Sequence, residues 1–167
     1  MTDWNGIDML IQLLCIGKIK EKYMREAIAE YQKRLSRFCR FEIIEVGDVS
    51  IPDRASEAEK EAVLKREGEL IAGKIKGGAF LVCMCVEGKS MATEAFAEKM
   101  KKLEITGTSH ICFVIGGSLG LWEELKKKAD LCLSLSEMTL THQMARLFLT
   151  EQIYRVYKMN RNETYHK

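Results

Sequence analysis

The chain has 167 residues, 47% of them hydrophobic, which is enough to bury one good core, so we expect a single domain. The formal net charge of +2 by itself implies neither a nucleic-acid nor a membrane partner, so any basic surface must be local. No apolar run approaches the roughly 20 residues of a membrane span, and no signal peptide is present. We therefore expect a soluble, cytoplasmic protein with no membrane partner.

The N-terminal residues 1–8 are polar and without pattern, and we expect them to form a flexible extension. The fold then begins near Met9, and 9–167 form one domain. Short apolar runs predict strands, and apolar residues at helical spacing predict helices. In chain order, strands are predicted over 9–16, 41–46, 79–86, 109–115 and 131–135. Helices are predicted over 24–38, from 56 to the glycines at 77–78, and over 94–103, 121–129 and 142 to about 160.

The predicted elements alternate between strand and helix along the whole domain. Such alternation indicates an α/β fold with a mostly parallel sheet. The runs 79–86 and 109–115 are apolar without alternation, as in strands that are covered on both faces. At the helix starts, Ser56 and Glu59 have the spacing of a capping box, and Thr93 is a candidate cap.

The six cysteines carry no metal-binding pattern. Five of them fall inside apolar runs, where small buried thiols in a reducing cytosol are the simplest interpretation. Cys83 and Cys85 are not a zinc knuckle, because no matching Cys or His pair lies at ligand spacing. We therefore expect no metal.

Three segments follow predicted strands, at 86–89, 116–120 and 135–141. Ligands of parallel sheets bind at the carboxyl ends of the strands, so these segments are candidates for one pocket. The glycines from Gly116 to Gly120 let backbone approach a ligand closely. They match neither a full dinucleotide fingerprint nor a Walker loop, and on the glycines alone a tight turn is equally compatible.

The stretch 134–139 alternates hydroxyl and apolar side chains. This alternation suits a backbone that hydrogen-bonds a flat heterocycle while side chains cover its faces. A simpler interpretation is that Thr139 or Thr141 caps the last helix, and the two interpretations are compatible.

The last helix interleaves basic and aromatic side chains. Between His142 and Lys167 there are five Lys/Arg and two Asp/Glu, an excess that is larger than the net charge of the whole chain. Basic residues among aromatics suit phosphate contacts and base stacking, but an amphipathic helix with a solvated charged face is favoured on composition. By position alone, His142 belongs to a capping turn and His166 to a frayed tail. Classical catalytic sets are absent from the sequence.

Taken together, several segments resemble the large-subunit ribosomal RNA methyltransferase H family of the SPOUT class. The resemblance covers 9–167 almost end to end. The segments that carry it are 14–18, 87–89, 113–121, 133–139, 142–143, 151–155 and 165–167.

The resemblance implies a SPOUT-type knot, in which a mostly parallel sheet of five or six strands has helices on both faces and a trefoil knot over about 110–167. It implies a homodimer whose active site combines both subunits, and S-adenosyl-L-methionine bound in a bent pose. The substrate would be a pseudouridine of 23S rRNA, methylated at N3 on the assembled ribosome. Carried over by position, the cofactor contacts are Met84, Gly116, Leu135, Ser136, Glu137, Met138, Thr139 and Leu140.

For catalysis, the resemblance makes His166 and Tyr165 the candidates for proton handling and base contact. Arg155 would stabilise developing negative charge or a phosphate. The expected RNA contacts are His142, Arg146, Lys158 and Arg161. The chain departs from the family where Met84-Cys85 replaces the usual Leu-Asp, which removes a carboxylate. Two alternatives remain: a SPOUT enzyme acting on another RNA such as tRNA, and a non-catalytic nucleotide-binding module.

Overall fold

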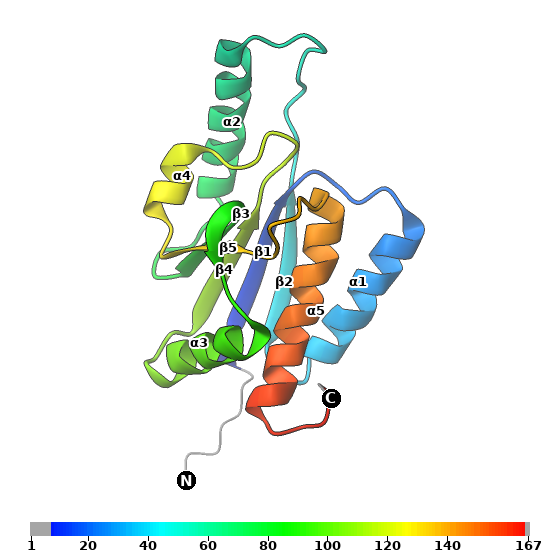
Figure 1. The fold of residues 1–167 in the computed structure, drawn as a ribbon, viewed down its shortest axis with the longest axis vertical. Helices are drawn as coiled ribbons and strands as arrows, with labels where there is room; N and C mark the ends of the chain where they lie inside the picture. The colour runs from blue at the N-terminus through cyan, green and yellow to red at the C-terminus, as the bar shows by residue number, and fades with distance from the viewer. Residues whose placement is uncertain (1–7, 166–167) are drawn as a thin grey trace.

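The computed structural model describes residues 8–165, so all but the last residue of the predicted extension at 1–8, and His166, lie outside the described residues. Within this range, strands and helices alternate as the sequence predicts (Figure 1). The strands are β1 (Leu10–Ile16), β2 (Arg40–Val46), β3 (Phe80–Ser90), β4 (His110–Ile115) and β5 (Leu131–Ser134). The helices are α1 (Lys22–Leu35), α2 (Glu57–Ala72), α3 (Thr93–Ile105), α4 (Glu123–Lys128) and α5 (His142–Asn160).

The described strands form one parallel sheet in the order β2-β1-β4-β3-β5. The predicted α/β class with a parallel sheet is confirmed. Strand β1 lies inside the sheet, and its Leu10 pairs with Arg40 of β2 and with His110 of β4. Because all pairs are parallel, the carboxyl ends of the strands share one edge of the sheet.

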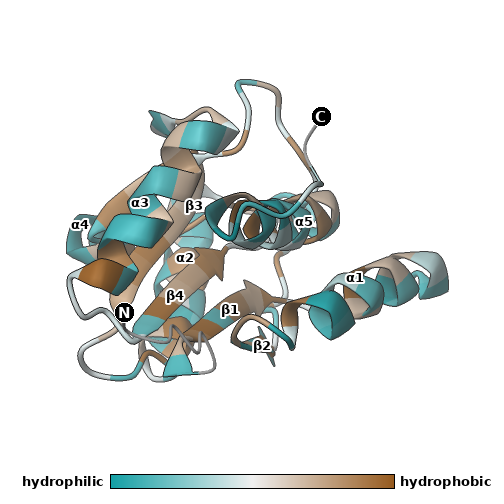
Figure 2. Cartoon of the chain, turned by 90° about the horizontal axis from the view of Figure 1, so that it is seen from below, coloured by the Kyte–Doolittle hydropathy of each residue, from teal (hydrophilic) through white to brown (hydrophobic). Residues whose placement is uncertain are grey.

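Helices cover both faces of this sheet. On one face, α1, α3 and α5 pack over a core that includes Leu13, Phe113 and Leu149. On the other face, α2 and α4 pack over Leu14 and Val114. Successive residues of β1 and β4 thus point into different cores, which explains why these strands are apolar except for Gln12 and His110 and largely brown in Figure 2. Within the described residues, no helix is long and apolar enough to cross a membrane.

The helix starts follow the sequence signals in two of three places. Ser56 and Glu59 form the predicted capping box of α2. Thr141 caps α5, because its side chain accepts a hydrogen bond from the backbone N–H of Met144 at 3.2 Å. Thr93 does not cap α3. It is the first helical residue, and its hydroxyl donates to Gln152 of α5 at 2.9 Å, which ties the two helices together.

Two predicted boundaries differ from the structure by four residues or more. Helix α2 ends at Ala72 and is capped at Gly73, five residues or so before the glycines that were expected to stop it. Strand β3 does not end at Val86 but continues to Ser90 through an irregularity in its pairing with β5. The segment 86–89 is therefore part of a distorted strand rather than a free loop.

Arg146 is the most deeply buried charged side chain of α5, with 2% of it exposed. One guanidinium nitrogen donates to the Glu45 carboxylate at 3.0 Å, and another donates to the Gly17 carbonyl at 3.1 Å. These partners lie at the carboxyl ends of β2 and β1. The expectation that Arg146 contacts RNA is therefore corrected. Its guanidinium group is buried and paired inside the protein, where it fixes the start of α5 to the sheet.

Replacing Arg146 by Met is expected to lower the free energy of unfolding by about 3 kcal/mol, because Glu45 and the Gly17 carbonyl lose their donor. Urea denaturation followed by circular dichroism, at one fixed protein concentration, measures the change. The matched control is Arg66→Met on the exposed face of α2, which removes the same charge and should change stability by less than about 0.5 kcal/mol. Equal effects of the two substitutions would contradict this role of Arg146.

Candidate functional site

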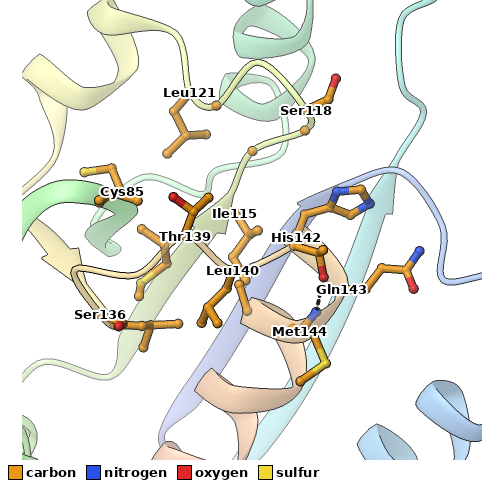
Figure 3. Close-up of a pocket in the computed structure, with 18 of the residues that line it drawn as sticks. Cys85, Ile115, Ser118, Leu121, Ser136, Thr139, Leu140, His142, Gln143 and Met144 are labelled. Carbon is orange, nitrogen blue, oxygen red and sulfur yellow. Dashed lines mark hydrogen bonds between the residues drawn. The ribbon is translucent and has the colours of Figure 1, made fainter.

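A cleft of about 840 Å³ opens at the carboxyl edge of the sheet, within the ~300–1,000 Å³ range of ligand pockets. Three segments form most of its wall: 84–87, 115–121 and 133–145 without residue 137. They follow or belong to β3, β4 and β5, as Figure 3 shows for the labelled side chains. The prediction that the three segments share one pocket is confirmed.

The glycine segment after β4 folds back on itself. A Cβ atom built on Gly116 would lie 2.2 Å from the carbonyl oxygen of Gly120, so no side chain fits there. Gly117 and Gly120 form an isolated antiparallel bridge, and Gly120 has a φ of +84°, which favours glycine. The sequence was compatible both with a tight turn and with a backbone that faces a ligand. The structure combines the two, because the segment is a tight turn whose backbone forms a wall of the cleft.

The first wall is a distortion of β3. Met84 and Lys89 both pair with Leu133 of β5, so 85–88 are left out of the ladder. Gly88 allows this close passage, since a Cβ there would lie 2.8 Å from the backbone of Cys132. The bulged residues Cys85, Val86 and Glu87 line the cleft instead.

A salt bridge fastens this bulge to α4. The Lys126 ammonium lies 2.6 Å from the Glu87 carboxylate and 2.8 Å from that of Glu123. The hydrogen bond from Lys126 lowers the pKa of Glu87, and the bonds to Glu123 and Glu87 raise the pKa of Lys126. Because Glu87 is 64% exposed, the pair adds little stability, but it holds the first wall of the cleft against α4. Lys126 has no distinguishing signal in the sequence, where it is one of several lysines in a short charged helix.

The third wall is the hydroxyl-rich segment before α5. The Ser134 hydroxyl donates to the Ser136 carbonyl at 3.0 Å, and the Ser136 hydroxyl accepts from the Met138 N–H at 3.0 Å. Two of the hydroxyls therefore shape the segment itself. All the cofactor candidates in 135–140 line the cleft except Glu137, as do Met84 and Gly116.

The cleft offers binding surface more than acid–base chemistry. Burial raises the pKa of the Cys85 thiol to about 12, and the neighbouring Glu87 and Cys132 add to the shift. At neutral pH Cys85 is a thiol, neither an activated nucleophile nor a ready metal ligand. Among the described residues, no three His, Cys, Asp or Glu side chains are grouped so as to hold a metal ion. A ligand that brings its own reactive group suits such a site.

The described catalytic candidates lie away from this cleft. The Tyr165 hydroxyl donates to the Glu151 carboxylate at 3.1 Å, and its ring packs edge-on against Tyr154. Arg155 is bonded to the same carboxylate at 2.7 Å and lies 4.8 Å from the Tyr165 ring centre. Helix α5 begins at the cleft, and Tyr154 is about 18 Å farther along its axis at 1.5 Å per residue. One chain therefore does not bring Tyr165 and Arg155 to its own cleft.

The remaining RNA candidates are divided between the two ends of α5. His142 lines the cleft at the start of the helix. Lys158 is bonded to Glu163 at 2.5 Å, and Arg161 lies 4.8 Å from the ring centre of Phe38. Only His142 of these is close to the candidate cofactor contacts.

Known proteins of similar sequence match nearly the whole length of this chain. The sequence model of a family described as "Predicted SPOUT methyltransferase" matches residues 9–166. A Ribosomal RNA large subunit methyltransferase H of Bifidobacterium adolescentis is 49% identical over 159 residues, covering 95% of this chain and 100% of the relative. The protein of that name from Acetivibrio thermocellus is 50% identical over the same shares of the two chains.

Solved structures of low sequence identity share the fold. A probable methylase family protein from Haemophilus influenzae superposes with a TM-score of 0.53 at 15% identity, covering 97% of this chain and 71% of that one. A probable methyltransferase from Bordetella pertussis gives 0.54 at 11% identity, covering 90% and 97%. The parallel sheet, the glycine turn at its carboxyl edge and the match over 9–166 agree, and the chain belongs to the SPOUT methyltransferase family.

Proposed function

We propose that this protein is an S-adenosyl-L-methionine-dependent methyltransferase that methylates N3 of a pseudouridine in 23S rRNA, on the assembled large ribosomal subunit in the cytoplasm. The observation that carries the proposal is the cleft at the carboxyl edge of the sheet, closed by a turn at Gly116 that admits no side chain. The relatives named for large-subunit ribosomal RNA favour that substrate over tRNA. Family membership favours a methyltransferase over a non-catalytic nucleotide-binding module.

The residues of the cleft fit the cofactor. The backbone at Gly116 can approach a flat ring closely, while Met84, Leu135 and Leu140 supply apolar contact. Ser136, Met138 and Thr139 complete the third wall. Glu137 lies in the same segment but does not line the cleft. When bound, the cofactor supplies a methyl group already activated by a sulfonium. The chain's own task is therefore to bind, orient and exclude water.

The proton of pseudouridine N3 must leave as the N–CH₃ bond forms. Burial, and the hydrogen bonds with Tyr31 and Glu151, raise the pKa of Tyr165, so that its hydroxyl donates hydrogen bonds at neutral pH and is a poor base. We therefore propose that Tyr165 contacts the pseudouridine ring and that His166 receives the N3 proton. Arg155, fixed between Glu151 and the Tyr165 ring, is placed to offset negative charge on the imide or on a phosphate.

This division of labour requires two chains. Tyr165 and the cleft lie near opposite ends of α5, so the tail of one subunit would complete the cleft of its partner. Exposed apolar side chains surround the cleft and the start of α5, among them Tyr23 at 70% and Met138 at 79% exposure, and Met144 and Phe148. Such a group suits burial against a second copy. The trefoil knot over about 110–167 belongs to the same proposal.

The first test is Gly116→Ala, which places a methyl group on the Gly120 carbonyl and should weaken S-adenosyl-L-methionine binding at least 100-fold, measured by calorimetry. The control is Gly47→Ala, where an added Cβ meets nothing within 4 Å and binding should be unchanged. Wild-type protein should bind neither ATP nor NAD comparably. Preference for either nucleotide, or full binding by the Gly116 variant, would count against the proposed cofactor site.

The second test removes residues after Glu163. This variant should keep cofactor binding but lose methylation of large subunits, read by mass mapping of rRNA nucleosides. Mixing it with the Gly116→Ala chain should restore about a quarter of wild-type activity, because half of the dimers are mixed and each holds one intact site. Full methylation by the truncated chain would contradict the catalytic role proposed for Tyr165 and His166. Failure of the mixture to regain activity would contradict a site shared between subunits.

A further inference from the structure

A second surface of interest lies at the far end of α5 from the cleft. The stretch from Lys33 to Arg40 carries four basic residues and no acidic one, and all four are exposed. It spans the end of α1, the turn after it and the first residue of β2. Figure 1 shows the end of α1 beside the end of α5, and the two helices are in contact. The basic residues of α5 therefore join those of α1 on one surface.

We call this surface the arginine patch. Its members are Lys33, Arg34, Arg37, Arg40, Lys158 and Arg161. Three carboxylates are ion-paired with these six cations: Glu30 bonds Arg34, Glu42 bonds Arg40, and Glu163 bonds both Arg37 and Lys158. A fourth, Glu104, interacts with Arg161, and burial raises its pKa to about 7, so it is only partly ionised at neutral pH. Six positive charges against three full negative ones and this partial one leave between +2 and +3, at least as much as the whole chain carries. The patch is thus a local positive region on a protein whose other charges nearly cancel.

Aromatic rings hold the guanidinium groups in place. The guanidinium groups of Arg37 and Arg161, which are far apart in the sequence, lie 4.7 and 4.8 Å from the centre of the Phe38 ring. Arg34 lies 5.5 Å from the ring centre of Tyr31 and 5.8 Å from that of Tyr154. The side chains of Arg34, Arg37 and Arg40 nevertheless remain 42%, 59% and 64% exposed. Positioned in this way, they lose less side-chain freedom on binding a partner.

We infer that the arginine patch is a docking surface for the phosphate backbone of the large-subunit RNA, an inference that rests on the proposed function. Arginine outnumbers lysine four to two in the patch, and its planar fork matches phosphate oxygens while its face stacks on bases. The large apolar side chains exposed on the described surface all lie outside the patch, so a membrane would find little to insert. RNA is the partner that these features favour.

The place of the patch suits its role. Arg37 and Lys158 hold Glu163, two residues before Tyr165, so RNA bound to the patch would lie next to the tail proposed to act on the base. The ion pairs of Arg34, Arg37 and Arg40 are exposed at one partner or both and are easily exchanged for phosphate, whereas the Lys158–Glu163 pair is more enclosed. The patch would supply affinity, and the tail and the partner's cleft would supply chemistry.

The test is the variant K33Q/R34Q/R40Q, which leaves Arg37 and hence the Glu163 contact intact. Binding to purified large ribosomal subunits is measured by filter retention at several KCl concentrations. Near 0.1 M salt, the variant should bind about 100-fold more weakly, and the slope of log affinity against log salt should fall by about 2. Affinity for S-adenosyl-L-methionine, measured by calorimetry, should not change. In methylation assays the KM for subunits should rise while kcat at saturating subunits is kept.

The control is K74Q/K101Q/K102Q, which removes the same charge from exposed positions of α3 and the segment after α2 and should bind subunits as the wild type does. Equal weakening of both variants, or wild-type binding by the patch variant, would overturn the inference. So would unchanged subunit binding together with lost retention on phosphatidylserine vesicles, which would assign the patch to a membrane surface. Wild-type protein that binds and methylates no large subunit would instead overturn the proposed function and the inference together.

Discussion

The buried guanidinium of Arg146 is the contact on which the geometry of the cleft depends. A charge removed from water needs partners, and here they are Glu45 at the end of β2 and the Gly17 carbonyl just after β1. Glu45 also accepts from the Ile19 N–H at 3.3 Å, so the same carboxylate fixes the start of the next connection. Because α5 begins only four residues before Arg146, the anchor also sets where the segment leading into α5 ends. A wall of the cleft is thus placed by an ion pair that does not line it.

Most of the architecture was predictable because local patterns decide it. Uninterrupted apolar runs mark strands that are buried on both faces, and the bounds of α5 follow from Thr141 and the helical spacing after it. Arg146 was not predictable in the same way. A basic residue in an amphipathic helix normally faces water, and its partner Glu45 lies 101 residues away in the chain. Only the assembled sheet brings the two together. The same holds for Thr93, whose hydroxyl serves Gln152 of another helix.

The candidate site shows the same division between local and assembled features. The glycines at 116–120 are a weak signal in the sequence, because a turn and a ligand contact look alike. The structure makes them one object through the contact between Gly116 and Gly120. The bulge in β3 could not be foreseen, since it depends on Gly88 passing the backbone of β5. The separation of Tyr165 from the cleft also depends on how α5 lies across the sheet. That separation is what makes a single chain an incomplete catalyst in the proposed function.

The order of the strands places the third wall of the cleft at an edge of the sheet. Strand β5 is the shortest of the described strands, with four residues, and it lies at an edge of the sheet, paired only with β3. The third wall of the cleft includes the end of this strand and the segment that follows it. Because β5 has a single neighbouring strand, the place of this wall is set by the ladder with β3 and by the burial of Leu133 and Ser134. A substitution that weakens this ladder would therefore displace residues that line the cleft without changing any of them.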